Sequence, residues 1–224
     1  MNQDAAAARS GEERILHAAI ELFGQRGVAA TSLKAIAAHA GVSQALIIHH
    51  YGSKDALRTA CDVHVAELLR ETKTEQVAQG AGLNPVLALA AIEEYQPAMR
   101  YLARTLTDGS PHANSLIDDM VADAQVYTAD AVDQGLVRPS TDPAARVAVL
   151  TLMGMGTLVL HEHLRRLIGE DLIGSDGPPL RYINAVMELF TDGFFTEGAY
   201  TELRQYASQN APAPPPAAPN EDRP

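Results

Sequence analysis

The segment from Thr31 to Leu57 constrains this chain most, because glycine and serine residues divide it into short helical pieces. A helix is predicted to begin near Thr31 and Ser32, whose hydroxyls can cap it, and its apolar residues follow the spacing of one buried face. Gly41 allows the chain to reverse at the end of that helix, because glycine tolerates a left-handed C-cap. The residues of the buried face are Leu33, Ile36, Ala37 and Ala40.

A second short helix is predicted to start at its N-cap Ser43 and to end before Gly52. Ser53 then caps a longer helix, and an amphipathic helix over 14–26 precedes the whole segment. Short helices in this order are typical of a helix-turn-helix, which places its second helix in the DNA major groove. The alternative is an ordinary helical bundle, in which glycine turns and serine caps also occur.

The segment TSLKAIAAHAGVSQALIIHHYGSKDAL resembles the signature of the tetracycline-repressor (TetR) family, and the match covers about the first 60 residues. The family usually shows a Thr-Thr or Thr-Ser start, an IA..AGVS core and a final SK..L. The resemblance implies an all-α protein with a three-helix DNA-binding domain over 9–53. A larger helical domain over 54–204 would bind an effector and dimerise. The segments YQPAMRYLARTLTDGS and LVRPSTDPAARVAVL are similar to actinobacterial regulators of this type, some of which control efflux pumps.

The recognition helix departs from the family pattern. Residues 46–48 are Leu-Ile-Ile where relatives often have Thr followed by Leu-Tyr, and residues 49–51 are His-His-Tyr instead of His-Tyr-Phe. In relatives the tyrosine at the position of Ile48 typically contacts a phosphate, and this chain lacks it. The alternative function is therefore a helical module that binds small molecules or proteins and has lost DNA recognition.

Side chains around the two short helices are the predicted DNA contacts. Gln44 is the best candidate for base contact, because an amide can bond the adenine edge with two hydrogen bonds. Ala45 and Leu46 are suited to thymine methyl groups, whereas Ile47 is expected to face inward. By chemistry and by resemblance, the predicted phosphate binders are Thr31, Lys34, Tyr51 and Lys54. The predicted set is completed by Ser32, Ser43, His49 and His50, and for His50 a packed imidazole is an equal alternative.

The net charge of −11 is unevenly divided along the chain. Residues 1–60 hold six Lys and Arg against five Asp and Glu, a net of +1, and residues 61–224 hold eleven against twenty-three, a net of −12. The acidic part is expected to face away from DNA. Binding should then be salt-sensitive and should need a specific site.

After Ser53 the chain is predicted to continue as helices, which end in a Pro- and Ala-rich disordered tail over 205–224. The first residues, 1–8, are also expected to be flexible. The helices are predicted over 54 to the high 70s, 84–94, 97–107, 111–134, 142–168 and 178–200. The last two carry long apolar stripes, and TetR relatives pair such helices across a two-fold axis. A homodimer on a palindromic DNA operator is therefore expected, with monomeric core packing as the alternative.

The middle of the chain is predicted, by resemblance, to hold a pocket for an apolar or amphipathic small molecule. Met adapts to varied apolar ligands and Tyr adds a polar group, although ordinary core packing is the alternative for each candidate. The candidates are Tyr95, Met99, Tyr101, Met120, Tyr127, Met153 and Met155. Gly154 and Gly156 interrupt a predicted helix, where they allow close helix contact or leave room for a ligand.

Other kinds of chemistry have little support in the sequence. Cys61 is the only cysteine, which excludes an intramolecular disulfide and suits the reducing cytoplasm, with a buried thiol or a redox sensor as its role. The His161-Glu162-His163 run lacks metal-ligand spacing, because i,i+2 side chains on a helix point apart. The apolar run 147–160 is too short to span a bilayer, and the N-terminus does not resemble a signal peptide. No enzyme activity, cofactor, metal or membrane association is expected.

Overall fold

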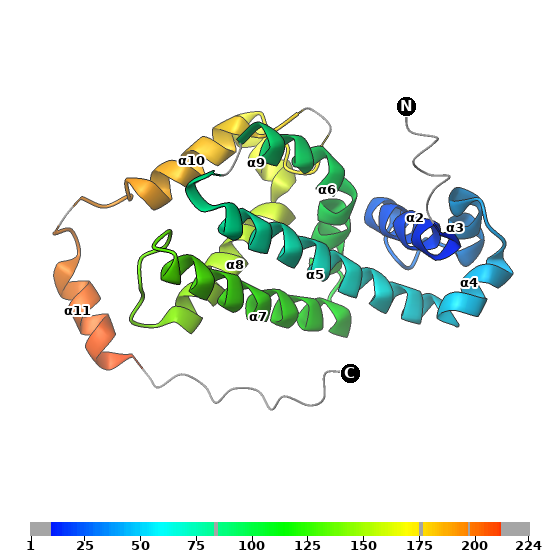
Figure 1. Cartoon of the computed structure of the whole chain (residues 1–224), viewed down its shortest axis with the longest axis horizontal. Helices are drawn as coiled ribbons and strands as arrows, with labels where there is room; N and C mark the ends of the chain where they lie inside the picture. The colour runs from blue at the N-terminus through cyan, green and yellow to red at the C-terminus, as the bar shows by residue number, and fades with distance from the viewer. Residues whose placement is uncertain (1–9, 83–84, 175–176, 197, 212–224) are drawn as a thin grey trace. The chain divides into compact units, whose positions relative to one another are not determined.

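Every secondary-structure element in the described part of the chain is helical, which confirms the predicted all-α class (Figure 1). The computed structural model describes residues 10–82, 85–174, 177–196 and 198–211, with the backbone alone at 81 and 85–94. They fall into two units, Met1–Pro179 and Leu180–Pro224. The elements are α2 (Gly11–Arg26), α3 (Leu33–Ala40), α4 (Gln44–Tyr51), α5 (Lys54–Gln79), η1 (Gly80–Gly82), α6 (Pro85–Leu106), α7 (Pro111–Asp133), α8 (Pro143–Val159), α9 (His161–Ile168), α10 (Leu180–Thr191) and α11 (Thr201–Asn210).

Serine side chains begin the helices of the predicted helix-turn-helix. Ser32, Ser43 and Ser53 each accept a hydrogen bond from the backbone amide three residues further on, and so cap α3, α4 and α5. Gly41 adopts a left-handed conformation, with φ 65°, between α3 and α4. These local signals place the boundaries of α3 and α4 where the sequence predicts them.

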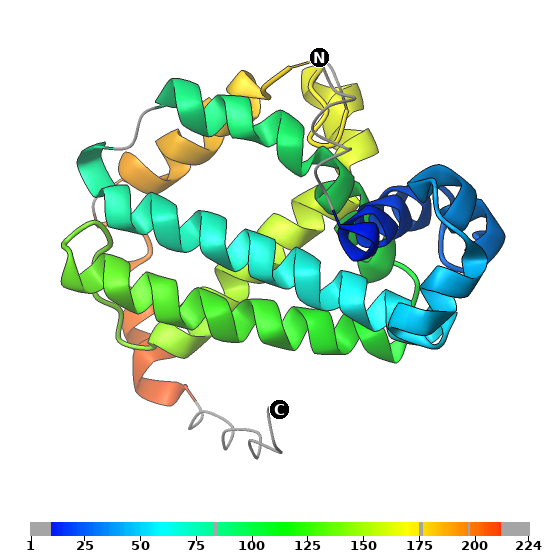
Figure 2. The same cartoon turned by 45° about the vertical axis from the view of Figure 1, so that its right-hand side comes forward.

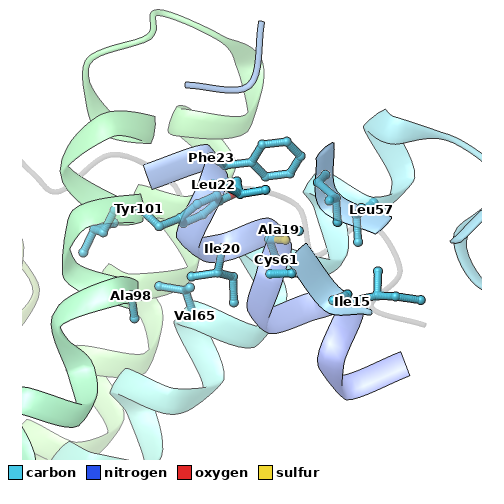
Figure 3. Packing of buried hydrophobic residues seen from close by; sticks show 14 of the residues in the cluster. Ile15, Ala19, Ile20, Leu22, Phe23, Leu57, Cys61, Val65, Ala98 and Tyr101 are labelled. Carbon is cyan, nitrogen blue, oxygen red and sulfur yellow. The ribbon is translucent and has the colours of Figure 1, made fainter. Parts of the chain in front are cut away.

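One apolar core joins α2 to α5 and α6 (Figure 3). Its fully buried members include Ile15 and Phe23 from α2, Leu57 and Cys61 from α5, and Tyr101 from α6. The ring centroids of Phe23 and Tyr101 lie 6.5 Å apart. Burial raises the pKa of the Cys61 thiol far above its usual value, so this thiol is a packing group.

The backbones of α2 and α6 approach each other closely at Gly24. A Cβ atom placed on Gly24 would lie 2.9 Å from the backbone nitrogen of Tyr101 and 3.2 Å from its Cα. Glycine is therefore needed here for packing rather than for a turn. On another side of the same unit, α5 and α7 lie side by side (Figure 2).

The helix α6 is continuous, where two helices over 84–94 and 97–107 are predicted. Pro97 lies inside it and not in a first turn. Proline removes one amide donor, but the residues that follow it, Ala98, Tyr101 and Leu102, are buried and hold the helix in place. In contrast, Pro111 and Pro143 begin α7 and α8, where a proline costs little because its missing amide would have no partner in the helix.

The predicted single helix 142–168 is broken at Leu160. Helices α8 and α9 meet there at an angle of 73°. At the start of α9, His161 Nδ1 lies 3.2 Å from Asp171 Oδ1, a contact that ties the helix to the loop that follows it. Within the described residues no single helix is long and apolar enough to cross a membrane, and α8 and α9 reach that criterion only when they are joined.

The unit that begins at Leu180 contains two helices where one, over 178–200, is predicted. Gly193, with φ 81°, follows the end of α10 at Thr191. Helix α11 then extends to Asn210, so the beginning of the predicted disordered tail 205–224 is helical. Residues 1–8 and 212–224, which the sequence predicts to be flexible, lie outside the described residues.

Candidate DNA interface

Helix α4 presents one exposed face, made of Gln44, Ala45, Ile48 and His49. These positions are one and four residues apart, which places them together on one side of a helix. The opposite side is anchored by Ile47, which is fully buried in the core, as predicted. The α4 face thus combines an amide, an imidazole and apolar groups, the types of group that contact base edges in a major groove.

Leu46 occupies a different place from the predicted one. Its side chain is half-buried and packs against the core, and a Cβ atom on Gly11 would lie 3.2 Å from Leu46 Cδ2. Leu46 is next to Ile47 on the helix and therefore turns toward the start of α2. The large apolar side chain on the α4 face is that of Ile48 instead, with 44% of its surface exposed.

Thr31 is also corrected from a phosphate binder to a structural residue. It is only 1% exposed. Its hydroxyl donates to the carbonyl oxygen of Gly27 at 2.8 Å and lies 3.2 Å from that of Leu22. The side chain therefore fixes the turn between α2 and α3 and does not reach solvent. A threonine soon after a helix-ending glycine often bonds nearby backbone, which is the sequence signal for this role.

The other predicted phosphate binders lie at or near the surface. Ser32 and Ser43 use their oxygens to cap α3 and α4, which leaves each hydroxyl hydrogen able to donate to another group. Lys34 is exposed on α3, and Lys54 is partly exposed at the first position of α5. Their positions are compatible with phosphate contact, and their role stays a prediction.

Tyr51 and His50 connect the end of α4 to the start of α2. Tyr51 Oη donates to the carbonyl oxygen of Glu12 at 3.4 Å, and His50 Nδ1 lies 3.9 Å from the Glu12 carboxylate. Burial, assisted by the charge of Glu12, raises the pKa of Tyr51 to about 12. A phosphate contact by the Tyr51 hydroxyl would have to replace its bond to Glu12.

The predicted effector residues do not share one environment. Tyr101 is fully buried, and its hydroxyl donates to Asp62 Oδ1 at 2.6 Å, so its polar group is already used. Met99 and Met120 are partly buried against the core, and Met155 is buried. Met153 is 59% exposed. The half-buried residues are Tyr95 and Tyr127, and burial raises the pKa of Tyr127.

A polar network that the sequence analysis missed joins α5 to α6 and α7. Asp62 accepts from Tyr101 and also lies 2.8 Å from His112 Nδ1, while His112 Nε2 is 3.4 Å from Asp55 Oδ1. Burial raises the pKa of Asp62, although the hydrogen bonds from Tyr101 and His112 oppose that rise. The same helix carries Arg58, whose Nη2 donates to Asp108 at 2.5 Å and to Ser110 at 2.7 Å.

The signal for this network lies in the spacing along α5. Arg58 and Asp62 each follow a member of the buried stripe formed by Leu57 and Cys61. Polar side chains next to such a stripe must find partners when they are buried. Their partners, however, come from residues about 40 to 50 positions away, which spacing does not reveal.

Two family models match this chain. Residues 15–61 match "Bacterial regulatory proteins, tetR family", and residues 93–196 match "Tetracyclin repressor-like, C-terminal domain". The HTH-type transcriptional regulatory protein RaaS of Mycobacterium tuberculosis is 43% identical over 148 residues, which cover 66% of this chain and 69% of RaaS. The chain belongs to the TetR family. It is a helix-turn-helix transcriptional regulator, and this confirms the predicted resemblance and function.

Other known regulators are also similar to this chain. The HTH-type transcriptional repressor Rv3405c of Mycobacterium tuberculosis is 30% identical over 178 residues, covering 78% of this chain and 86% of that repressor. The crystal structure of the regulator FadR from Bacillus subtilis, in complex with stearoyl-CoA, has a TM-score of 0.55 at 15% identity. That comparison covers 82% of this chain and 99% of FadR, and it shows that the two chains share a fold.

Proposed function

We propose that this TetR-family regulator binds a roughly palindromic DNA operator as a homodimer and represses transcription in the cytoplasm until a small molecule releases it. The observation that carries this proposal is the exposed α4 face on a serine-capped helix-turn-helix. Gln44 at the start of α4 would contact bases, while Ala45 and Ile48 would meet thymine methyl groups. Lys34, Lys54 and the capping serines would contact phosphates and so position the helix.

The exposed apolar residues on α8 and α10 support a homodimer. In α8, Val149, Leu152 and Met153 are each more than half exposed, and in α10 the same holds for Phe190. Large apolar side chains exposed on each of these helices are suited to a protein interface. A two-fold dimer would present two copies of α4 to two half-sites, which is why the operator is expected to be palindromic.

The proposed effector is an apolar or amphipathic small molecule bound within α6, α7 and α8. Methionine and tyrosine side chains on these helices, Met99, Met120 and Tyr127 among them, supply adaptable apolar contacts with a polar group. The polar network of Asp62, Tyr101 and His112 joins α6 and α7 to α5, which directly follows α4. If the effector weakens DNA binding through this connection, DNA weakens effector binding by the same factor.

The test is binding of the purified protein to the intergenic DNA upstream of its own coding sequence, against a scrambled duplex, at two salt concentrations. Selective binding with a two-fold footprint is expected. Gln44→Ala should weaken operator binding about 10-fold or more, because one bidentate base contact contributes about 1–3 kcal/mol. Gln125→Ala, on the exposed surface of α7, is the matched control and should bind like the wild type.

The alternative is a helical binding module that no longer recognises DNA, which the apolar Ile48 on the α4 face favours. Equal, weak binding to both duplexes that disappears at moderate salt would support this alternative, since it indicates phosphate attraction alone. In that case Gln44→Ala and Gln125→Ala would bind DNA alike.

A further inference from the structure

A hollow of about 500 Å³ lies where the helix-turn-helix meets α6 and α7. Its walls are the last turn of α2, the turn over 27–30, one residue of α5, the C-terminal end of α6 and the loop that leads into α7. This volume is within the range of small-molecule sites. None of the predicted effector residues except Tyr101 lines it.

Three arginines line this hollow, and one carboxylate accompanies them. The carboxylate, Asp108, accepts hydrogen bonds from Arg58 and from the backbone amide of Ser110. Its partial burial is outweighed by these hydrogen bonds and by the charge of Arg58, which together lower the pKa of Asp108. The side chains of Arg26 and Arg104 form no hydrogen bond or ion pair with any described residue. The hollow therefore carries an excess of two positive charges in a chain whose net charge is −11.

Arg58 forms the buried floor of this cluster. It is only 7% exposed, and its Nη2 is held by Asp108 and Ser110, so the guanidinium is fixed in position. Its Nε is buried and has no hydrogen-bond partner among the described residues. A buried donor without a partner is costly, so the two hydrogen bonds made by Nη2 are what hold this guanidinium in place.

Gly27 brings a second guanidinium against the turn. A Cβ atom at Gly27 would lie 3.3 Å from Arg104 Nε, so the absence of a side chain lets Arg104 lie close to the backbone there. Gly27 also has φ 79°, a conformation that favours glycine. Arg104 therefore lies against the wall formed by the turn, and both Arg104 and Arg26 line the hollow.

We propose that this hollow binds a small anion, through a phosphate or carboxylate group held by Arg26, Arg58 and Arg104. Guanidinium groups match these oxyanions with paired, charge-assisted hydrogen bonds. Because the end of α2 and the turn before α3 form one wall, an occupant fixes the helix-turn-helix against α6. This site is distinct from the proposed effector pocket among α6, α7 and α8.

The test is a titration of the full chain, without DNA, followed by NMR signals of the arginine Nε–Hε groups. Inorganic phosphate and acetate are the two probes, each added at constant ionic strength against chloride. We expect a few arginine signals to shift in a saturable way, and the tighter-binding probe identifies the phosphate or carboxylate group as the preferred one. Arg104→Gln and Arg26→Gln should each weaken binding about tenfold, since each removes a charge-assisted contact.

Arg166→Gln, an exposed arginine on α9 outside the hollow, is the matched control. It should bind the probe like the wild type. Arg26 and Arg104 are both exposed, so neither substitution is expected to unfold the chain. Non-saturating shifts for both probes, or an equal loss of affinity in Arg166→Gln, would overturn the site. Because no DNA is present, this result is independent of operator binding.

Discussion

The buried hydroxyl of Thr31 stabilises the fold, and its contribution to the free energy of unfolding can be measured by removing it. It lies within hydrogen-bonding distance of the carbonyl oxygens of Leu22 and Gly27 in a buried position. Thr31→Val keeps the shape of the side chain but leaves both carbonyl oxygens without this donor. We expect the free energy of unfolding to fall by about 1–3 kcal/mol in denaturant titrations followed by circular dichroism.

Thr31→Ser is the control for this experiment, because it keeps the hydroxyl and loses only a methyl group. It should be more stable than Thr31→Val. If Thr31→Val has the stability of the wild type but binds operator DNA more weakly, the result would support the phosphate contact that the sequence predicts for Thr31.

Tyr51 makes the stability of the folded chain depend on pH in the alkaline range. Its pKa is raised from 10.0 to about 12, mainly by burial and further by the charge of Glu12. Because the folded value is higher than the unfolded value, the stabilisation from the neutral phenol is complete below pH 10 and is lost as the pH rises toward 12. The difference in phenolate absorbance between the wild type and Tyr51→Phe should show a midpoint near pH 12. A midpoint near pH 10 would mean that the Tyr51 side chain is not buried against α2.

At the scale of helices, two glycines are expected to respond in opposite ways to alanine. In α2, Gly24→Ala places a methyl group against the backbone of α6, and this overpacking should cost about 1–3 kcal/mol of stability. In α8, a Cβ on Gly154 meets nothing within 4 Å in the same chain, so Gly154→Ala should add up to about 1 kcal/mol of helix stability. Thermal unfolding of the two variants measures both effects, and equal effects would contradict the close contact at Gly24.

Local signals predicted the helices well where the structure depends on neighbours in sequence. Ser32, Ser43 and Gly41 mark the helix-turn-helix because caps and left-handed turns involve only a few adjacent residues. The predicted break before Pro97 and the predicted continuity of one helix across Leu160 are wrong for the opposite reason. Whether a proline is tolerated, or a leucine ends a helix, depends here on packing and on contacts such as His161 with Asp171.

At the scale of the whole molecule, the proposed dimer can be disrupted at either of its two helices. Met153 in α8 and Phe190 in α10 are 59% and 60% exposed. Met153→Glu and Phe190→Glu should each give a monomer in analytical ultracentrifugation, because each buries an unpaired charge in the interface. Operator affinity should fall by roughly 100-fold or more, since two linked half-sites contribute more than one.

Val126→Glu is the matched control for these variants. Val126 is 65% exposed on α7, outside the two proposed interface helices. It should remain a dimer with unchanged operator affinity. Dimers that persist in both Met153→Glu and Phe190→Glu would place the interface elsewhere.

The functional sites could be predicted only in part. The exposed positions of Gln44 and Ala45 follow from the period of a single helix, and so does the buried position of Ile47. The cluster of Arg26, Arg58 and Arg104 could not be predicted, because it brings together three separate helices. Nothing in the spacing of those arginines indicates that they share one hollow.

The contact at Gly24 also determines how motion can pass between the two parts of this regulator. Side-chain contacts absorb small displacements, because exposed rotamers rearrange within picoseconds to nanoseconds. At Gly24 the backbones of α2 and α6 meet without a side chain between them. A shift of α6 at this point therefore acts directly on the backbone of α2, and through α2 on the helix-turn-helix. The speed of the response to an effector would then be that of whole-helix motion, in the microsecond to millisecond range.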